Sequence, residues 1–245
     1  MSDDRDIFKA QCRQDAKTMA ADPIMRKLSI DWAVHAAKYN YTYGFTWLGL
    51  PIIQLPADIV ALQEIIWDVK PDVIVETGVA RGGSLIFFAS LMKLLENKGF
   101  VIGIDIDIRP HNRHAIETHP FASAIQLIQG SSIDPQTIEK VKRAVSGRAN
   151  VMVVLDSNHT HEHVYKELKL YAPLVNVGNY IIVQDTTVEY LPEGFFKDRD
   201  WGKGNNPSTA VSVFLKENSN FIIDKEIDDK LLISSTWGGY LKRIN

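Results

Sequence analysis

The stretch VIVETGVARGGSLIFFAS, Val73 to Ser90, predicts the fold of this chain. A run of β-branched residues leads into a glycine-rich turn, and the turn opens an apolar helix. A strand, a glycine turn and a helix N-terminus in this order usually form the seat of a nucleotide or another cofactor. Glu76 stands just before the glycines, so the residues around the turn decide which ligand fits.

Short apolar runs alternate with helical patterns from this stretch onward. The runs span 72–77, 100–107, 124–130, 150–156 and 180–185, and the helical patterns between them span 84–97, 113–119, 134–145 and 161–175. Near-continuous valine and isoleucine runs are typical of strands covered on both faces, as in a parallel sheet with right-handed helical crossovers. The sequence therefore predicts an α/β protein with a doubly wound, mostly parallel, Rossmann-like sheet, which has seven strands when two strand-like segments near the C-terminus are added to these five.

The two ends of the chain have different patterns. After a helix at 206–218, the strand-like segments 220–228 and 230–244 follow without a full helix between them, which predicts a hairpin or an antiparallel edge. Residues 1–70 predict a helical, aromatic-rich arm that acts as a cap, an oligomer contact or a substrate contact. Residues 71–245 then form the cofactor-binding domain.

The composition is that of an ordinary globular protein. The 245 residues are 45% hydrophobic and 23% charged, and a net charge of −3 gives no general attraction to nucleic acid or to anionic membranes. No apolar run approaches the roughly 20 residues that span a bilayer. Cys12 is the only cysteine, which favours a reducing compartment. We expect a cytoplasmic protein with no nucleic-acid or membrane partner.

Three cofactor classes compete for the glycine turn. The dinucleotide motif G-x-G-x-x-G is absent, because three residues separate Gly78 from Gly82. Gly78 and Gly83 have the spacing of a P-loop, but Ser84 occupies the lysine position, so no cation meets the phosphates. S-adenosylmethionine (SAM) carries a cationic sulfonium and an amino-acid head, and both suit Glu76 and a close glycine backbone.

The next strand ends in GIDID, where Asp105 is placed to accept hydrogen bonds from both hydroxyls of a ribose. For either Glu76 or Asp105 alone, a solvated strand end is the favoured interpretation. On successive strands, with a glycine turn between them, the two carboxylates favour SAM.

A second group of polar residues follows the last two parallel strands. VVLDSNH supplies Asp156 and His159, and IIVQDTT supplies Gln184 and Asp185. The carboxyl ends of parallel strands open on one side of the sheet, so these residues are expected to converge beside the cofactor. Oxygen ligands of this kind suit Mg²⁺, and His159 is placed as a general base. The alternative is that the two aspartates only cap helices.

This chemistry fits transfer of a methyl group to a hydroxyl. The sulfonium already activates the methyl group, and alignment of two bound reactants contributes roughly 7–11 kcal/mol. A competing interpretation is a zinc hydrolase, because HTHEH contains H-x-x-E-H with His159 and His163 as ligands and Glu162 as base. The motif is short and opens a helix directly after a buried strand, which counts against zinc.

IVETGVARGGSLIFFASLM, VIGIDIDIR, VVLDSNHTHEHV, IIVQDT and the tail ending GGYLKRI together resemble the cephalosporin hydroxylase/rhamnosyl O-methyltransferase family. The resemblance covers the chain from about Tyr43 onward. It implies a SAM-dependent, Mg²⁺-dependent O-methyltransferase of a small hydroxylated molecule, such as a sugar or secondary metabolite, that is often a homo-oligomer.

The resemblance also implies roles for individual residues. The donor site comprises Glu76, Gly78, Gly82, Ser84, Asp105 at the ribose, Ser131 near the adenine and Asp156. Asp156, Gln184 and Asp185 match the metal positions, and His159 matches the base. The family usually has Glu-Asp where this chain has Gln184-Asp185, so one negative charge is missing. A non-catalytic, SAM-binding partner subunit therefore stands as an alternative function. Separately, the glycines, aromatic residues and mixed charges of residues 188–207 predict a lid over the acceptor.

Overall fold

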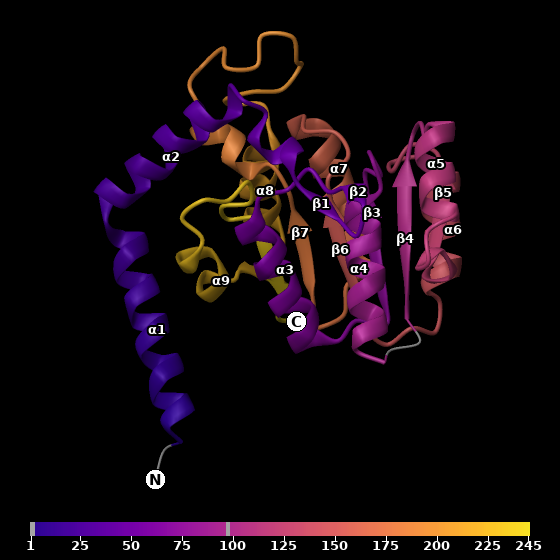
Figure 1. Ribbon diagram of the computed structural model, residues 1–245, viewed down its shortest axis with the longest axis horizontal. Helices are drawn as coiled ribbons and strands as arrows, with labels where there is room; N and C mark the ends of the chain where they lie inside the picture. The colour runs from indigo at the N-terminus through magenta and orange to yellow at the C-terminus, as the bar shows by residue number, and fades with distance from the viewer. Residues whose placement is uncertain (1–2, 97–98) are drawn as a thin grey trace.

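The computed structural model describes residues 3–96 and 99–245 of the chain (Figure 1). The first two residues of the predicted arm, and Asn97 at the end of the predicted helix 84–97, lie outside the described residues. A seven-stranded sheet with the order β5-β4-β3-β6-β7-β9-β8 forms the centre. Its strands are β3 (Val73–Thr77), β4 (Phe100–Asp105), β5 (Ile125–Gln129), β6 (Val151–Leu155), β7 (Tyr180–Val183), β8 (Phe221–Ile223) and β9 (Tyr240–Arg243).

The strand pairing confirms the predicted doubly wound, mostly parallel sheet. β3 pairs in parallel with β4 and with β6, and β9 is antiparallel to both of its neighbours, β7 and β8. From β3 the chain first builds outward through β4 and β5, and it then crosses to the other side of β3 to form β6 and β7. Ligands of such sheets bind at this switch point, outside the carboxyl ends of the strands.

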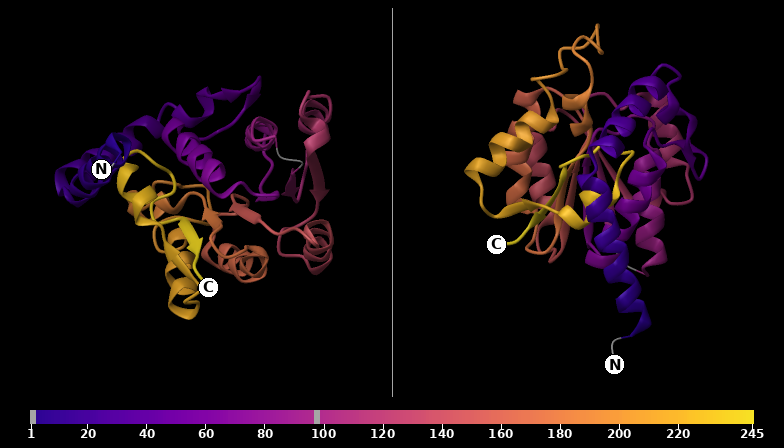
Figure 2. Two further views of the ribbon diagram at one scale, coloured as in Figure 1. Left: turned by 90° about the horizontal axis from the view of Figure 1, so that it is seen from below. Right: turned by 90° about the vertical axis from the view of Figure 1, so that its left-hand side faces the viewer.

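Helices cover both faces of the sheet, as Figure 2 shows from two further sides. One apolar core packs the sheet against α6 (Pro135–Val145), α7 (His161–Tyr171) and α8 (Pro207–Glu217). The other core packs it against α3 (Pro56–Val69), α4 (Gly83–Leu94) and α5 (Pro110–Glu117). Strand residues alternate between the two cores, so the identity of a residue's core tells which face its side chain occupies.

The arm is largely helical, as predicted. α1 (Asp4–Ala21) and α2 (Pro23–Ala37) begin at the capping carboxylates of Asp3 and Asp22. α1 has no buried residue among those described and reaches away from the sheet along α9 (Figure 1). A short hairpin of β1 (Thr46–Trp47) and β2 (Leu50–Pro51) follows, and α3 then packs its Leu62 and Ile65 into the core.

The C-terminal hairpin is less continuous than predicted. β8 and β9 do pair antiparallel, but α9 (Lys225–Lys230) and an irregular loop separate them. Asp224 accepts hydrogen bonds from the backbone N–H groups of Glu226 and Ile227, which starts the helix. The expected strand at 230–244 is shortened to β9, because residues 234–236 bond to side chains of the core instead of to a neighbouring strand.

No helix in the parts of the chain that the structure describes is long and apolar enough to cross a membrane.

Candidate active site

Three predicted site residues lie on one face at the carboxyl edge of the sheet. Glu76 lies in β3, and Asp156 and Gln184 directly follow the neighbouring strands β6 and β7. Each follows by two positions a residue of the core beneath α3 and α4, namely Ile74, Val154 and Ile182. The alternation of side chains therefore places all three on that face, at the switch point of the sheet.

Glu76 is fully buried and only half satisfied. Ser84 Oγ donates a hydrogen bond of 2.8 Å to Glu76 Oε2, while Oε1 has no partner. Burial raises the pKa of Glu76 to about 8, against the hydrogen bond from Ser84 and with a further contribution from the charge of Asp105. A buried carboxylate with a free oxygen suits a cationic ligand, because the ligand both supplies a donor and favours ionisation.

The glycine turn lets the two central strands approach each other. Gly78 has φ +94°, and a Cβ at this position would lie 2.0 Å from the carbonyl oxygen of Asp156. Gly82 has φ +84°, and a Cβ there would lie 2.5 Å from the side chain of Ile116. The backbone at Gly78 therefore contacts the Asp156 loop directly, and a side chain at either glycine would push the turn open.

Asp105 joins the glycine turn to the second strand end. Its Oδ2 accepts hydrogen bonds from the backbone N–H of Val79 at 2.9 Å and of Ala80 at 3.3 Å. The backbone carbonyl of Asp105 accepts from Gly130 N–H at 2.9 Å, which brings the turn carrying Ser131 alongside. The structure thus brings Asp105 and the Ser131 turn together beside the glycine turn, and part of the Asp105 carboxylate is occupied by that turn.

Ile106, directly after Asp105, is an apolar residue that the sequence analysis did not single out. Its side chain is 72% exposed, although the strand before it is buried. An exposed isoleucine beside a carboxylate and a glycine turn offers an apolar surface for a flat ring. The signal in the sequence was its place between two aspartates at the end of a strand.

The predicted metal and base residues form a compact cluster. Asp156, His159 and Asp185 can each offer one ligand atom such that all three atoms lie within 4.8 Å of one another. His159 Nε2 lies 3.4 Å from Asp185 Oδ2. Asp185 has φ +57°, a left-handed conformation that aspartate tolerates better than most residues and that often occurs at functional sites.

The electrostatics of this cluster favour a bound cation. Burial, and then the charges of Asp185, Glu76 and Glu167, raise the pKa of Asp156 well above its ordinary value. Within the described residues, the only ion pairs made by these four acids involve histidines: His159 with Asp185, and His163 with Glu167. A cation placed among the carboxylates relieves their mutual repulsion.

Gln184 is next to this cluster, but its oxygen is engaged elsewhere. The residue is 2% exposed, and its Oε1 accepts a hydrogen bond of 2.6 Å from Thr236 Oγ1 and a longer contact of 3.5 Å from Ser235 Oγ. Its Nε2 has no partner. A carbonyl oxygen has two lone pairs, so Thr236 leaves one of them for a cation or for a ligand.

The zinc-hydrolase alternative does not fit the geometry. His159 lies in the loop before α7, and its ring is close to Asp185. His163 instead lies 2.9 Å from Ser132 Oγ and 3.6 Å from Glu167. Glu162 is paired with Lys166 and its side chain is 79% exposed. The two histidines thus serve different neighbours, and the proposed base faces solvent.

The segment 188–207 carries an aromatic residue onto the cluster. The rings of Trp201 and His159 are 4.9 Å apart at 79°, and Phe196 packs against Trp201 at 4.3 Å. Glu189 Oε2 accepts hydrogen bonds from Gly204 N–H at 2.9 Å and from Asn206 Nδ2 at 2.6 Å. Trp201 therefore forms part of the wall around His159. Hydrogen bonds from Gly204 and Asn206 to Glu189 join the two ends of the segment.

Two polar networks, each with a fully buried carboxylate, support the site, and the sequence analysis missed both. In the first, Asp58 of α3 accepts from Ser234 Oγ at 2.5 Å, Ser235 N–H at 2.8 Å and Tyr240 OH at 3.0 Å. Ser235 in turn approaches Gln184, so the network connects α3 with the metal edge. Burial raises the pKa of Asp58, although all these hydrogen bonds oppose the shift.

The second network links the Ser131 turn to the Asp156 loop. Ser157 Oγ donates a hydrogen bond of 2.7 Å to Glu167 Oε1, and His163 contacts the hydroxyls of Ser132 and Ser157. Tyr171 OH donates to the carbonyl of Ser132 at 2.8 Å. Ser132 and Ser157 lie in loops and His163 and Glu167 lie in α7, and nothing in the sequence indicates that these side chains meet.

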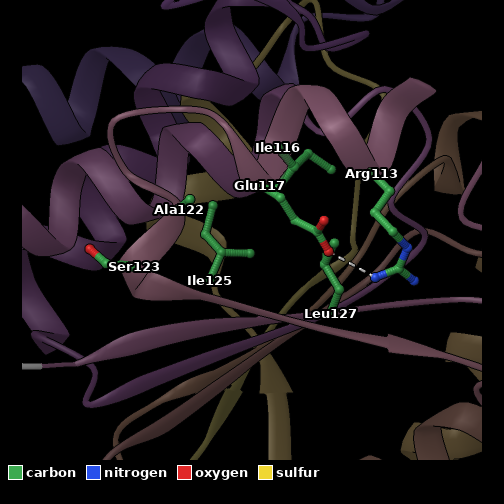
Figure 3. Close-up of a pocket in the computed structure, with 7 residues that line it drawn as sticks. All are labelled: Arg113, Ile116, Glu117, Ala122, Ser123, Ile125 and Leu127. Atoms are coloured by element: carbon green, nitrogen blue, oxygen red, sulfur yellow. Dashed lines mark hydrogen bonds and ion pairs between the residues drawn. The ribbon is translucent and has the colours of Figure 1, made fainter. Parts of the chain in front are cut away.

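Two hollows of the described structure lie away from the carboxylates at the strand ends. One, of about 350 Å³, lies between α5 and the edge strand β5, where Figure 3 shows Arg113 and Glu117 as an ion pair above Ile125 and Leu127. The other, of about 690 Å³, is a groove between α1 and α9. Neither is lined by a predicted site residue, so the chemistry of the strand ends, and not a cavity, identifies the site.

The side chains of the site fit the two predicted ligands, Mg²⁺ and SAM. Two carboxylates with an imidazole beside them suit a hard divalent cation, which prefers oxygen ligands and keeps other positions for water or substrate. The free Oε1 of buried Glu76 suits the cationic amino-acid head of SAM. Both fits rest on the same excess of negative charge at one edge of the sheet.

The chain is similar to known proteins over most of its length. The profile of the family described as Rhamnosyl O-methyltransferase/CmcI matches residues 39–244. The rhamnosyl O-methyltransferase of Mycobacterium tuberculosis (strain H37Rv) is 27% identical over 203 residues, which cover 81% of this chain and 78% of the relative.

Two solved structures of CmcI share the fold. The apo structure of CmcI-N160 aligns with a TM-score of 0.58 at 24% identity, covering 83% of this chain and 77% of CmcI. CmcI-D160 with Mg and SAM aligns with a TM-score of 0.58 at 24% identity, covering 83% and 78%.

Proposed function

This chain belongs to the Rhamnosyl O-methyltransferase/CmcI family, and we propose that it transfers a methyl group from SAM to a hydroxyl of a small molecule. The observation that carries the proposal is the row of Glu76, Asp156 and Gln184 at the switch point, with Asp105 and Asp185 beside it. This row supplies the negative charge that a sulfonium and a divalent cation require, on the side of the sheet where ligands bind.

In the proposed donor site, Glu76 meets the ammonium of the amino-acid head, and Asp105 meets the ribose. Gly78, Gly82 and Ser84 shape the turn against which the donor lies, Ser131 borders the adenine, and Asp156 faces the methionine end. The supporting contacts are the hydrogen bond of Ser84 to Glu76 and those of the turn to Asp105. The chain thus holds the donor at several points and fixes the direction of its methyl group.

In the proposed acceptor site, His159 takes the proton of the hydroxyl as the oxygen attacks the methyl group. Asp185, 3.4 Å away, stabilises the imidazolium that results. Trp201 covers the His159 ring and limits the access of water. Asp156, Asp185 and, through its remaining lone pair, Gln184 would hold Mg²⁺, which when bound lowers the pKa of a hydroxyl next to it.

We further propose a small hydroxylated acceptor, such as a sugar or a secondary metabolite, since relatives named rhamnosyl O-methyltransferase act on rhamnosyl groups. A reducing compartment such as the cytoplasm is proposed because Cys12 is the only cysteine. Self-association through the arm, residues 1–70, is proposed because its aromatic and aliphatic residues are exposed, among them Phe8, Tyr39 and Tyr43.

Calorimetry with SAM and with its product S-adenosylhomocysteine (SAH) tests the function. We expect both to bind, and we expect methyl transfer to a panel of sugars and hydroxylated metabolites to require Mg²⁺. Folded protein that binds neither compound would contradict the proposal. Protein that binds both, yet transfers no methyl group to any acceptor, would favour the non-catalytic partner subunit.

A further inference from the structure

Gln54 is a buried amide whose hydrogen-bonding groups are both unused. The residue precedes α3 and is 4% exposed, and neither its Oε1 nor its Nε2 has a partner. A buried amide without partners costs free energy, so native proteins satisfy nearly all such groups. A group that stays unsatisfied in the free protein is often one that a ligand satisfies.

The backbone around Gln54 is held in a strained conformation. Ile53, directly before it, has φ +53°, which is a genuine outlier for a β-branched residue. Strain of this kind persists only where the surrounding structure imposes it, and it concentrates at functional sites. Here the preceding residues are wedged against the glycine turn: a Cβ on Gly83 would lie 2.2 Å from the carbonyl oxygen of Pro51.

The topology places Gln54 at the same edge as the acidic residues. α3 leads directly into β3 and lies against the sheet with its last residue near the start of that strand, so the first residues of α3 lie toward the carboxyl ends (Figure 1). Four residues after Gln54, in the first turn of α3, Asp58 bonds Ser235, which approaches Gln184. Gln54 therefore belongs to the polar side of the face that carries Glu76 and Gln184.

The unused atoms on this face form a complementary set. Glu76 Oε1 and Gln54 Oε1 are acceptors, while Gln54 Nε2 and Gln184 Nε2 are donors. An amino acid in its zwitterionic form needs acceptors for its ammonium and donors for its carboxylate, and both lie on one carbon. We infer that Gln54 binds the amino-acid head of the methyl donor, and that it does so together with Glu76 and Gln184.

This inference rests on the proposed function, and it makes Gln54 a donor-binding residue and not only part of the packing of α3. The amide can rotate so that its carbonyl faces the ammonium and its N–H groups face the carboxylate. Binding then satisfies atoms that the free protein leaves without partners. Without ligand, the wild type is therefore less stable than a variant that carries an apolar residue of the same shape at position 54.

The test uses two ligands and the variant Gln54→Met, which keeps the length of the side chain and removes its hydrogen bonds. SAH carries the amino-acid head, and 5′-methylthioadenosine lacks it. We expect Gln54→Met to weaken SAH by about 10- to 100-fold, since hydrogen bonds to charged groups are lost. The affinity of the variant for methylthioadenosine should be unchanged. Where the heat of methylthioadenosine binding is small, this affinity is measured by competition with SAH.

Two further measurements make the result specific. Without ligand, Gln54→Met should unfold at a higher temperature than the wild type, and SAH should raise this temperature less. Gln54→Glu, which keeps the shape but replaces the N–H donors by a charge, should also weaken SAH alone. Gln63→Met, at a half-buried glutamine in α3, is the matched control and should change neither affinity.

The inference is overturned if Gln54→Met and Gln54→Glu bind SAH as the wild type does, because ordered water then satisfies the amide. It is also overturned if they weaken SAH and methylthioadenosine equally, because the effect is then one on the shape of the site. Failure of the proposed function is a separate result, since in that case the wild type itself binds neither SAM nor SAH.

Discussion

Thr236 donates a hydrogen bond of 2.6 Å to Gln184, and the two residues are 52 positions apart in the sequence. Gln184 directly follows the parallel strand β7 at the site, and Thr236 lies in the loop before the antiparallel β9. The C-terminal loop therefore fixes the orientation of a side chain at the metal edge. It also explains how an amide is held beside Asp156 and Asp185 without contributing a charge of its own.

Replacing Gln184 by Glu is expected to tighten Mg²⁺ binding by about tenfold, because a carboxylate joins two others and Thr236 can still donate to it. The same change should lower the stability of the metal-free protein, since one more negative charge is buried. Titration of Mg²⁺ by calorimetry, with unfolding followed in EDTA, measures both effects. Gln126→Glu, at an exposed position of β5, is the control. Unaltered Mg²⁺ affinity in Gln184→Glu would remove this residue from the metal site.

Glu76 makes the stability of the ligand-free protein depend on pH. Its pKa is about 8 in the folded chain against 4.5 for an ordinary glutamate, so the native state binds more protons than the unfolded state between these values. The contribution of Glu76 to the free energy of unfolding is therefore greatest below about pH 4.5 and falls as the pH rises to about 8. Above that pH this contribution no longer changes. Burial of the charge, and not loss of a contact, is the cause.

Glu76→Gln should remove this part of the pH dependence, since the amide keeps a hydrogen bond to Ser84 and cannot ionise. We expect the variant to be more stable than the wild type at pH 8.5, by an amount on the order of a few kcal/mol, and nearly equal to it at pH 5. Urea unfolding at the two pH values, without donor, measures the difference. Parallel pH profiles of the two proteins would show that Glu76 is already ionised in the free protein.

The sequence predicted the parts of this site that depend on local periodicity. Glu76, Asp105 and Asp156 follow apolar strands, and in a parallel sheet the carboxyl ends of adjacent strands meet, so their convergence could be expected. The close approach of the backbone at Gly78 followed from the glycine turn. These features need only the order of the elements and the direction of the strands.

The remaining features depend on contacts between distant segments. Asp58 is bound by Ser234 at a separation of 176 positions, and nothing in the sequence around either residue marks the pair. The burial of Gln54 depends on how the arm closes over the glycine turn. The loop before β9 interrupts what reads as a strand, because its hydroxyls find side-chain partners in the core. Long-range polar contacts of this kind leave no periodic signal.

Asp105→Asn is expected to weaken SAH binding by about tenfold or more. The asparagine oxygen can still accept the N–H of Val79, so the glycine turn keeps its support. The second oxygen, which accepts from the backbone N–H of Asp107 at 3.0 Å and which the ribose hydroxyls also need, is lost together with the charge. Calorimetry with SAH measures the change, and Asp107→Asn, at an exposed aspartate two residues later, is the matched control. Equal affinity in Asp105→Asn and the wild type would mean that the aspartate serves only the turn.

His159 separates the proposed methyl transfer from the binding of its donor. Replacing it by Asn removes the group that takes the proton, and we expect the rate of transfer at saturating SAM to fall roughly 100- to 10,000-fold. SAH affinity should not change, because the contacts proposed for the donor come from other residues. The matched control is His161→Asn, since His161 lies two residues away and bonds Thr209 instead of the acidic cluster. A loss of the same size in both variants would indicate damage to the loop before α7. A normal rate in His159→Asn would instead require that the hydroxyl loses its proton without this base.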